Sequence, residues 1–444
     1  MVLMRRMLAA VTAALLALTA CGDNADPDDG AGAGPVRLLV FGSPDELDAY
    51  RTLVASYHQV APNADVQLVE ASDRADLIAR LSTSIAGGEP PDLFLMNYRF
   101  YGQFAAKGAI EPLDARIAAS KSVRPDAYYP TAMNAFKWRG EQLCLPQNVS
   151  SLAVYLNRDL FRRYGVPEPE AGWTWTDLIQ TASALTRDAN GVQLAGVENE
   201  GGPRRVAVYG LGLEPSMIRL APFVWSNGGE IVDDPARPTR LTLDTPAARE
   251  ALKNFVDLRL AYGVVPTDEE VEAEDDESRF ANGRLAMLLS SRRSTTTFRS
   301  ITAFEWDVAP LPGYGRTAGI LHSDAYCMTR DAENKAGAWR FMEYAMSPEG
   351  QRAIVGTGRT VPSHIETSRS SAFLGSAQPP RSAQVFLDAI PTVRAMPTIS
   401  TWPEIEDVTG GILENALYRG DPVDQVIRDL DQQTRPLFAR GEGP

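Results

Sequence analysis

Histidine and cysteine are scarce in this sequence of 444 residues, with three of each. His58, His322 and His364 have no histidine partner four residues away and no adjacent cysteine, so their spacing forms no zinc motif. The chain has no Gly-x-Ser-x-Gly elbow, and Gly210–Gly212 and Gly356–Gly358 lack the third glycine of a dinucleotide loop. We therefore predict no cofactor and no metal, and we expect a protein that is not an enzyme.

Carboxylates are the one catalytic residue type that is plentiful. Asp and Glu total 57 against 43 Lys and Arg, a formal charge of −14. An extracellular glycosidase with a carboxylate pair therefore stays open as an alternative. The deficit of positive charge and the lack of a basic stripe predict no nucleic-acid partner. Eight of the ten residues 268–277 are acidic, which predicts a solvated helix start or loop, with calcium binding as the sharper alternative.

Long apolar runs are absent except near the N-terminus. Arg5 and Arg6 precede an apolar run from Met7 to Ala20, which is shorter than the roughly 20 residues of a membrane span and has the layout of a secretory signal. Leu18–Cys21 reads as a lipobox, in which the Cys21 thiol is acylated, for example with palmitate. We expect residues 1–20 to be a lipoprotein signal peptide, and the protein to be extracytoplasmic and anchored to the cell membrane by lipid.

Two further segments follow from composition and length. Residues 21–35 are Gly, Ala, Asp and Pro with almost nothing to bury, which predicts a flexible tether. The remaining chain is too long for one ordinary core, so we expect two lobes of about two hundred residues each.

Strands and helices alternate at the start of the folded part, which predicts an α/β class with a parallel sheet. Expected strands are 36–41, 65–69 and 92–96, with helices over 44–60 and from Asp73 to Gly88. Later signals predict a helix at Trp175–Leu185, behind a Thr174/Asp177 capping box, and a helix from Pro246 to 260. Buried strands are expected at 285–289 and 306–309, and further helices at 332–346, 349–355, 405–417 and 422–430.

Two cysteines remain once Cys21 is assigned to lipid. Cys144 and Cys327 could form a disulfide in an oxidising compartment. They could equally be buried free thiols that pack as small apolar side chains.

Several segments, in order along residues 36–435, resemble the family 1 extracellular solute-binding proteins of ABC importers, the group that includes the maltose-binding protein. The segments are Pro90–Asn97, Leu145–Phe161, Trp173–Leu178, Asn227–Glu230, Phe280–Met287 and Phe341–Gln351. Each motif alone is common, but their ordered combination behind a lipobox is specific. The resemblance implies a two-lobed periplasmic-binding-protein-like fold with hinge crossings and a ligand cleft between the lobes.

The resemblance also implies lobe boundaries, partners and a function. One lobe would contain 36–146 and about 327–372, and the other 147–326 and about 373–444. The crossings would bring Cys144 and Cys327 together as a disulfide. A monomeric protein would capture a carbohydrate by lobe closure and deliver it to ABC permease subunits. A glycerol phosphate or glycerophosphodiester as solute, and a sensor without a permease, are the alternatives.

Sugar sites combine aromatic platforms with polar side chains that form several hydrogen bonds, so we looked for such residues at strand ends and crossings. The candidate ligand-binding residues are Phe41, Ser43, Asp45, Asn97, Tyr98, Asn148, Trp225, Ser291, Arg292, His322, Ser323, Arg359 and Trp402. Maltose-binding relatives place an aromatic residue near Arg292 and Arg293. The departure argues against a maltodextrin and favours a solute with many hydroxyls or a negative charge.

Overall fold

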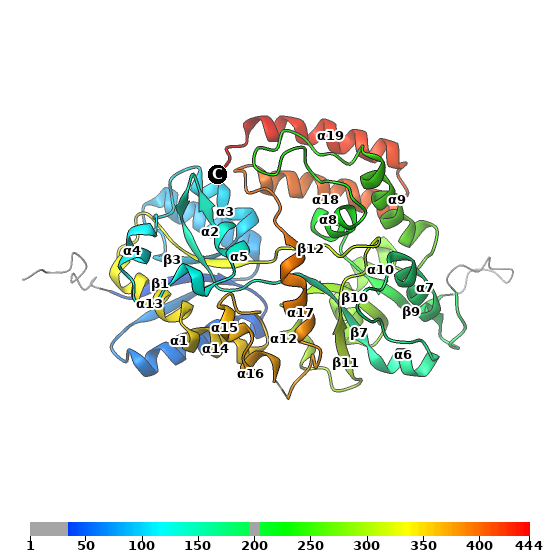
Figure 1. Ribbon diagram of the computed structural model, residues 1–444, viewed down its shortest axis with the longest axis horizontal. Coiled ribbons are helices and arrows are strands. Elements are labelled where there is room, and N and C mark those ends of the chain that lie inside the picture. Colours follow the sequence, from blue (N-terminus) through cyan, green and yellow to red (C-terminus); the bar gives the residue numbers. More distant parts are fainter. Residues whose placement is uncertain (1–33, 195–204, 376) are drawn as a thin grey trace, which may run out of the picture.

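Two five-stranded sheets form the centres of two lobes that lie side by side (Figure 1). The computed structural model describes residues 34–194, 205–375 and 377–444. The two-lobed α/β fold predicted from the sequence is confirmed. The predicted signal peptide, Cys21 and most of the predicted tether lie outside the described residues.

The first sheet has the strand order β2-β1-β3-β13-β6. Strand β1 runs parallel to β2 and β3, whereas β13 is antiparallel to both β3 and β6. Its strands are β1 (Val36–Phe41), β2 (Val66–Ala71), β3 (Leu93–Asn97), β6 (Cys144–Pro146) and β13 (Asp324–Met328). The parallel strands end together at one edge, where β1 and β3 deliver Phe41 and Asn97.

The helices around this sheet begin at clear capping signals. Ser43 and Glu46 form a capping box at α1 (Pro44–Val60), and Asp73 caps α2 (Arg74–Gly87), which ends at Gly88 with φ 77°. The other helices of this lobe are α3 (Tyr98–Ala105), α4 (Asp114–Ala119), α5 (Pro130–Asn134), α13 (Lys335–Met346), α14 (Pro348–Thr357) and α15 (Ile365–Ser368).

The second sheet has the order β11-β7-β10-β9-β8. Strand β10 is antiparallel to β7 and parallel to β9, and its last residue, Ser291, lines the cavity described below. The strands are β7 (Leu152–Asn157), β8 (Arg187–Asp188), β9 (Val206–Gly212), β10 (Leu285–Ser291) and β11 (Trp306–Ala309). Short paired strands elsewhere are β4 (Lys137–Trp138) with β5 (Glu141–Gln142), and β12 (Gly319–Ile320) with β14 (Val393–Arg394).

Helices make up much of the second lobe. The Thr174/Asp177 capping box is present at α7 (Trp175–Leu185), and α8 (Met217–Ser226) is buried along its whole length. Its other helices are α6 (Arg158–Tyr164), α9 (Pro246–Leu260), α10 (Asp268–Ala273), α11 (Asp276–Ala281), α12 (Ser294–Phe298), α17 (Gln384–Ala389), α18 (Trp402–Arg419) and α19 (Val423–Arg440). The short helix α16 (Ser371–Leu374) packs on α14 and α15 of the first lobe.

Two predictions about the C-terminal helices need correction. Helix α19 continues to Arg440 instead of ending near 430, because Phe438 is buried and packs against Trp402, with ring centroids 6.3 Å apart. Helix α18 packs on α8 and α9 but also on α3 of the first lobe, so the segment after 373 does not belong to the second lobe alone. In Figure 1 the red and orange helices α19 and α18 lie along the top of the molecule.

Two crossings of the chain run between the lobes as a hydrogen-bonded pair. The Ser150 amide donates to the His322 carbonyl at 2.9 Å, and the His322 amide donates to the Ser150 carbonyl at 2.8 Å. Because β13 begins at Asp324 and pairs with β3 and β6, residues 324–326 belong to the first lobe. The predicted boundary at 326/327 therefore moves to 323/324.

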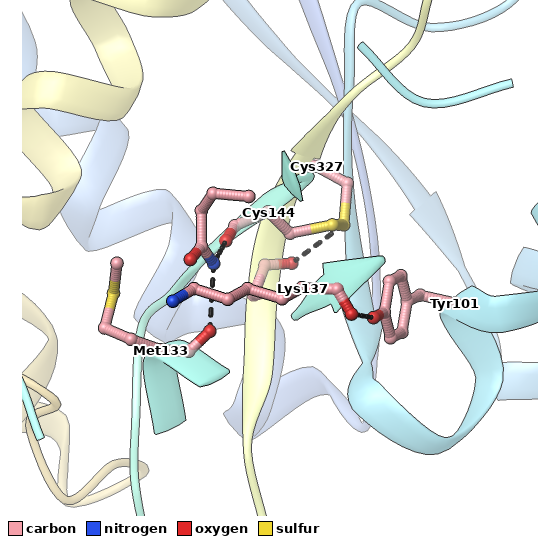
Figure 2. The surroundings of a disulfide bond; sticks show 7 residues. Tyr101, Met133, Lys137, Cys144 and Cys327 are labelled. Atoms are coloured by element: carbon pink, nitrogen blue, oxygen red, sulfur yellow. Dashed lines mark hydrogen bonds between the residues drawn. A yellow bond between two sulfur atoms is a disulfide. The ribbon is translucent and has the colours of Figure 1, made fainter. Parts of the chain in front are cut away.

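Cys144 and Cys327 form a disulfide, the pairing implied by the family resemblance. They face each other on the antiparallel strands β6 and β13 (Figure 2), with Cα atoms 4.4 Å apart. Nearby, the Gln142 side-chain amide donates to the carbonyls of Met133 and Cys144. The bond therefore lies inside the first sheet and joins the bases of the two crossings, without spanning the gap between the lobes.

Candidate functional site

A cavity of about 920 Å³ lies between the lobes and is lined from both sides. Its volume is at the upper end of the range typical for small-molecule sites, about 300–1,000 Å³. The first lobe, the crossings and the second lobe all contribute polar side chains. They include Glu46, Arg74, Asn97, Arg99, Asn148, His322, Asp324, Arg359, Glu214, Arg219, Asp268, Glu272, Ser291, Arg293, Glu406, Asp407 and Glu414.

Eight of the residues predicted from the sequence line this cavity. They come from the ends of β1, β3 and β10, from the two crossings and from the turn after α14: Phe41, Ser43, Asn97, Asn148, Ser291, Arg292, His322 and Arg359. The structure thus brings together side chains that are hundreds of residues apart in the chain. Their contact with a solute stays a prediction.

Five predicted residues do not line the cavity. Asp45 is exposed on the outer side of the first turn of α1. Tyr98 is buried, and its hydroxyl accepts a hydrogen bond from the Met396 amide at 3.0 Å. Ser323 is buried and donates to the Asn148 carbonyl at 2.7 Å.

The two predicted tryptophan platforms are also part of the core. Trp225 is 4 % exposed and its ring is covered by the Arg394 guanidinium at 4.6 Å. Trp402 is fully buried and its indole nitrogen donates to Glu406 at 2.7 Å. In both cases aromatic area that could have faced a sugar is used for packing.

Asparagine side chains at the crossings hold the base of the cavity rigidly. The Asn97 amide donates to the Asp324 carboxylate at 3.0 Å, and the Asn148 side-chain oxygen accepts from the Asp324 backbone amide at 2.8 Å. Asn97 also caps α3 by accepting from the Arg99 amide at 3.2 Å. Asn97 therefore both caps a helix and lines the cavity.

Arg359 is a buried charge that faces three groups from two elements, α1 and β13. Its guanidinium lies 3.5 Å from Glu46 and 3.9 Å from Asp324, and 5.1 Å from the ring centroid of Tyr50. Burial disfavours its charged form, but Tyr50, Glu46 and Asp324 outweigh this and raise the pKa of Arg359. It therefore stays charged and neutralises two carboxylates beside the cavity.

Arg292 lines the cavity, but neighbouring protein groups hold its guanidinium. Its Nε donates to the Gly358 carbonyl at 2.9 Å, and its guanidinium lies about 5 Å from the rings of Phe373 and Phe386. Burial lowers the pKa of Arg292 to about 10. Its neighbour Arg293, which was not among the predicted site residues, pairs with Glu277 at 2.9 Å and approaches Glu46 of the other lobe at 3.9 Å.

Several cavity residues were missed by the sequence analysis. Arg74 and Arg99 follow the ends of β2 and β3, so the strand-end rule that selected Asn97 could have found them. Arg219 is the one charged residue in the otherwise apolar helix α8, and that isolation was a usable signal. Glu406 lies on α18, and no local pattern places that helix beside the first lobe.

Positive charge converges on His322 at the second crossing. Burial lowers the pKa of His322 well below its usual value, and the nearby guanidiniums of Arg219 and Arg99 lower it further. The imidazole is therefore neutral at pH 7. Its Nε2 is buried and has no hydrogen-bond partner among the described residues.

Within 34–194, 205–375 and 377–444, no group of three or more His, Cys, Asp or Glu side chains is arranged to hold a metal ion. Over the same ranges no helix combines the length and apolarity needed to cross a membrane.

Two lobes joined by paired crossings around a polar cavity define a hinged solute-binding architecture. The model of the family described as bacterial extracellular solute-binding protein matches residues 43–352. This chain therefore belongs to that family, as the resemblance in its sequence indicated.

Three similar proteins illustrate the match. A candidate binding protein of Brucella abortus is 25 % identical over 80 % of this chain and 81 % of its own. The Listeria monocytogenes ABC substrate-binding protein solved with cycloalternan has a TM-score of 0.81 at 24 % identity, over 91 % of this chain and 99 % of that one. UgpB from Mycobacterium tuberculosis, solved with glycerophosphocholine, has a TM-score of 0.76 at 20 % identity, over 92 % and 99 %.

Proposed function

We propose that this protein captures a carbohydrate between its two lobes and delivers it to the permease of an ABC importer. The observation that carries the proposal is the interlobe cavity of about 920 Å³, which is lined by polar groups from both lobes and both crossings. A ligand that touches both lobes stabilises the closed arrangement by its contacts there.

The composition of the lining supports a polyhydroxylated ligand. Phe41 and Tyr418 offer apolar ring faces, and Asn97, Asn148 and the carboxylates around them offer hydrogen bonds to hydroxyls. The Listeria neighbour was solved with cycloalternan, which agrees with a carbohydrate. Capture without chemical change is the proposed activity, in keeping with the family and its solute-binding neighbours.

The N-terminal residues supply the proposed location. The lipobox Leu18–Cys21 would tether the folded lobes to the outer face of the cell membrane, close to a permease. Replacing Cys21 with Ser should move the protein from the membrane fraction to the medium or periplasm and abolish incorporation of a palmitate analogue. Unchanged membrane association in this variant would contradict the anchor.

A thermal-shift screen of the purified full-length protein against mono- and oligosaccharides tests the capture function. A solute that binds only the folded state raises the melting temperature, by mass action, as its concentration exceeds Kd. Calorimetry on the best solute should then give one site per chain.

A matched pair of phenylalanine variants ties that binding to the cavity. Phe41→Ala removes a ring that lines the cavity and should weaken binding about tenfold or more. Phe304→Ala removes a half-buried ring of the second lobe that packs on Phe280 away from the cavity, and should leave affinity unchanged. Equal affinities in both variants would show that the cavity is not the binding site.

A further inference from the structure

Arg219 carries a positive charge into the apolar helix α8 without a full set of partners. The residue is 6 % exposed, and its Nε and Nη1 atoms are buried with no hydrogen-bond partner within the described part of the chain. Its remaining nitrogen lies 3.3 Å from Glu214, whose side chain is 62 % exposed. A buried guanidinium with unused donors is costly, yet Arg219 lines the cavity, where a bound group could accept those hydrogen bonds.

Two more buried polar atoms of cavity-lining residues have no hydrogen-bond partner among residues 34–194, 205–375 and 377–444. They are the Ser216 hydroxyl, at the N-cap of α8, and Nε2 of His322. The ten-residue helix α8 presents its N-terminal residues Ser216 and Met217 to the cavity, and the N-terminal end of a helix favours negative charge. Three side chains that can donate hydrogen bonds therefore line the same cavity, and two of them, Ser216 and Arg219, lie where the helix begins.

The other cavity arginines strengthen the positive potential there. Arg74, Arg99 and Arg293 are close enough to His322 to lower its pKa, and Arg99 and Arg293 also act on Arg219. Arg74 lies over the ring of Phe100, 4.2 Å from its centroid.

Among the described residues, the carboxylates of the cavity other than Glu214 form no ion pair with Arg219. Glu46 and Asp324 face Arg359, and Glu406 pairs with Arg99. Asp268, Glu272, Asp407 and Glu414 come from α10 and α18. Glu214 is thus the carboxylate within ion-pair distance of Arg219 among the described residues.

We propose that Ser216, Arg219 and His322 form an anion subsite, and that the captured solute carries a phosphate or carboxylate group on its polyhydroxylated body. The proposal rests on the capture function proposed above and names its substrate class. A planar guanidinium and a hydroxyl at a helix N-terminus match the oxygens of either anion.

Matched pairs of probes test the subsite in the purified full-length protein. The pairs are glucose with glucose 6-phosphate, glucose with glucuronate, and glycerol with glycerol 3-phosphate; glycerophosphocholine and inorganic phosphate complete the panel. In at least one pair the anionic member should bind at least tenfold more tightly by calorimetry, and its affinity should fall as NaCl is raised. The phosphate and carboxylate arms distinguish the two anions.

Variants of the subsite and a surface control complete the test. Arg219→Gln should weaken the anionic probe about 10- to 100-fold and change its neutral partner less than threefold. Arg240→Gln, at a surface arginine that pairs with Asp244, should change neither. Ser216→Ala removes a hydroxyl that makes no hydrogen bond to any residue that the structure describes, so it should weaken the anionic probe several-fold even if Arg219→Gln fails to fold.

These measurements distinguish failure of the anion subsite from failure of the capture function. If neutral and anionic partners bind equally and Ser216→Ala and Arg219→Gln act on both alike, the anion subsite is wrong and the capture function stands. If no saccharide and no anionic probe binds, capture itself is wrong and the subsite with it.

Discussion

At the scale of the residue, Arg359 balances charge at the boundary between the lobes. Its side chain is 3 % exposed and faces Glu46 and Asp324, whose side chains are 8 % and 16 % exposed. Removing one partner of such a group leaves buried carboxylates uncompensated. We expect Arg359→Gln to lower the free energy of unfolding by about 3–5 kcal/mol, measured by urea denaturation.

An exposed arginine provides the comparison for this variant. Arg440 pairs with Glu404 at 2.6 Å, and both side chains are more than half exposed. Because exposed pairs contribute about 0–1 kcal/mol, Arg440→Gln should have little effect. Similar losses in the two variants would contradict the role assigned to Arg359.

The buried carboxyl group of Asp276 makes the stability of the folded protein depend on pH. Burial raises its pKa from 3.8 to about 7, although Arg279 opposes the shift. The folded state therefore keeps a proton that the unfolded chain releases above about pH 4, so stability should fall as pH rises from about 4 to about 7 and then level off. The slope from this group is at most about 1.4 kcal/mol per pH unit.

Asp276→Asn should remove this slope. The variant should be more stable than the parent protein at pH 8 and nearly equal to it at pH 4.5, as measured by urea denaturation at several pH values. The exposed Asp126→Asn variant is the control and should follow the parent profile. A parent protein whose stability rises steadily from pH 4.5 to 8 with no difference from Asp276→Asn would refute the assignment.

At the scale of the element, the disulfide joins strands β6 and β13, the bases of the two crossings. It closes a loop across a sequence separation of 183 residues. Constraining so long a loop in the unfolded chain stabilises the fold, typically by about 2–4 kcal/mol. The double variant Cys144→Ser with Cys327→Ser should lose that amount in urea denaturation.

Reduction provides an independent check on the same bond. A reducing agent should lower the melting temperature of the parent protein and leave that of the double variant unchanged. Because both cysteines lie in the first sheet, solute affinity should change little in the folded double variant. A large loss of affinity would mean that the bond also sets the arrangement of the lobes.

At the scale of the whole molecule, ion pairs reach across the gap between the lobes. Arg293 of the second lobe approaches Glu46 of the first at 3.9 Å, and Arg99 of the first pairs with Glu406 on α18. A solute that contacts both sides adds to these contacts and favours closure. Small-angle scattering should therefore show a smaller radius of gyration when the strongest-binding solute is added at saturation.

The Phe41→Ala variant links the change in the radius of gyration to solute binding in the cavity. Phe41→Ala at a solute concentration below its weakened Kd should keep the radius of gyration of the free protein. An unchanged radius in the parent protein at saturation would mean that capture does not involve closure.

Much of the architecture could be predicted because it is encoded locally. Helix starts at Ser43, Asp73 and Thr174 satisfy their own backbone amides within three residues. Strands β1 and β11 have the predicted bounds, since each is a short, mostly apolar segment whose apolar residues are mainly buried. Errors gathered at the ends of α18 and α19 and at the boundary near 324, where contacts distant in sequence decide the outcome.

By itself, the sequence determined the order of strands and helices, their caps, the family and the segments that end at the edge of a sheet, because these depend on neighbours along the chain. Only the tertiary structure decided which side chains reach the cavity. Trp225 and Trp402 are buried in packing, whereas Arg219 is brought from an apolar helix to the cavity wall. Burial and charge pairing between lobes depend on residues far apart in sequence, and those partners meet only when the chain has folded.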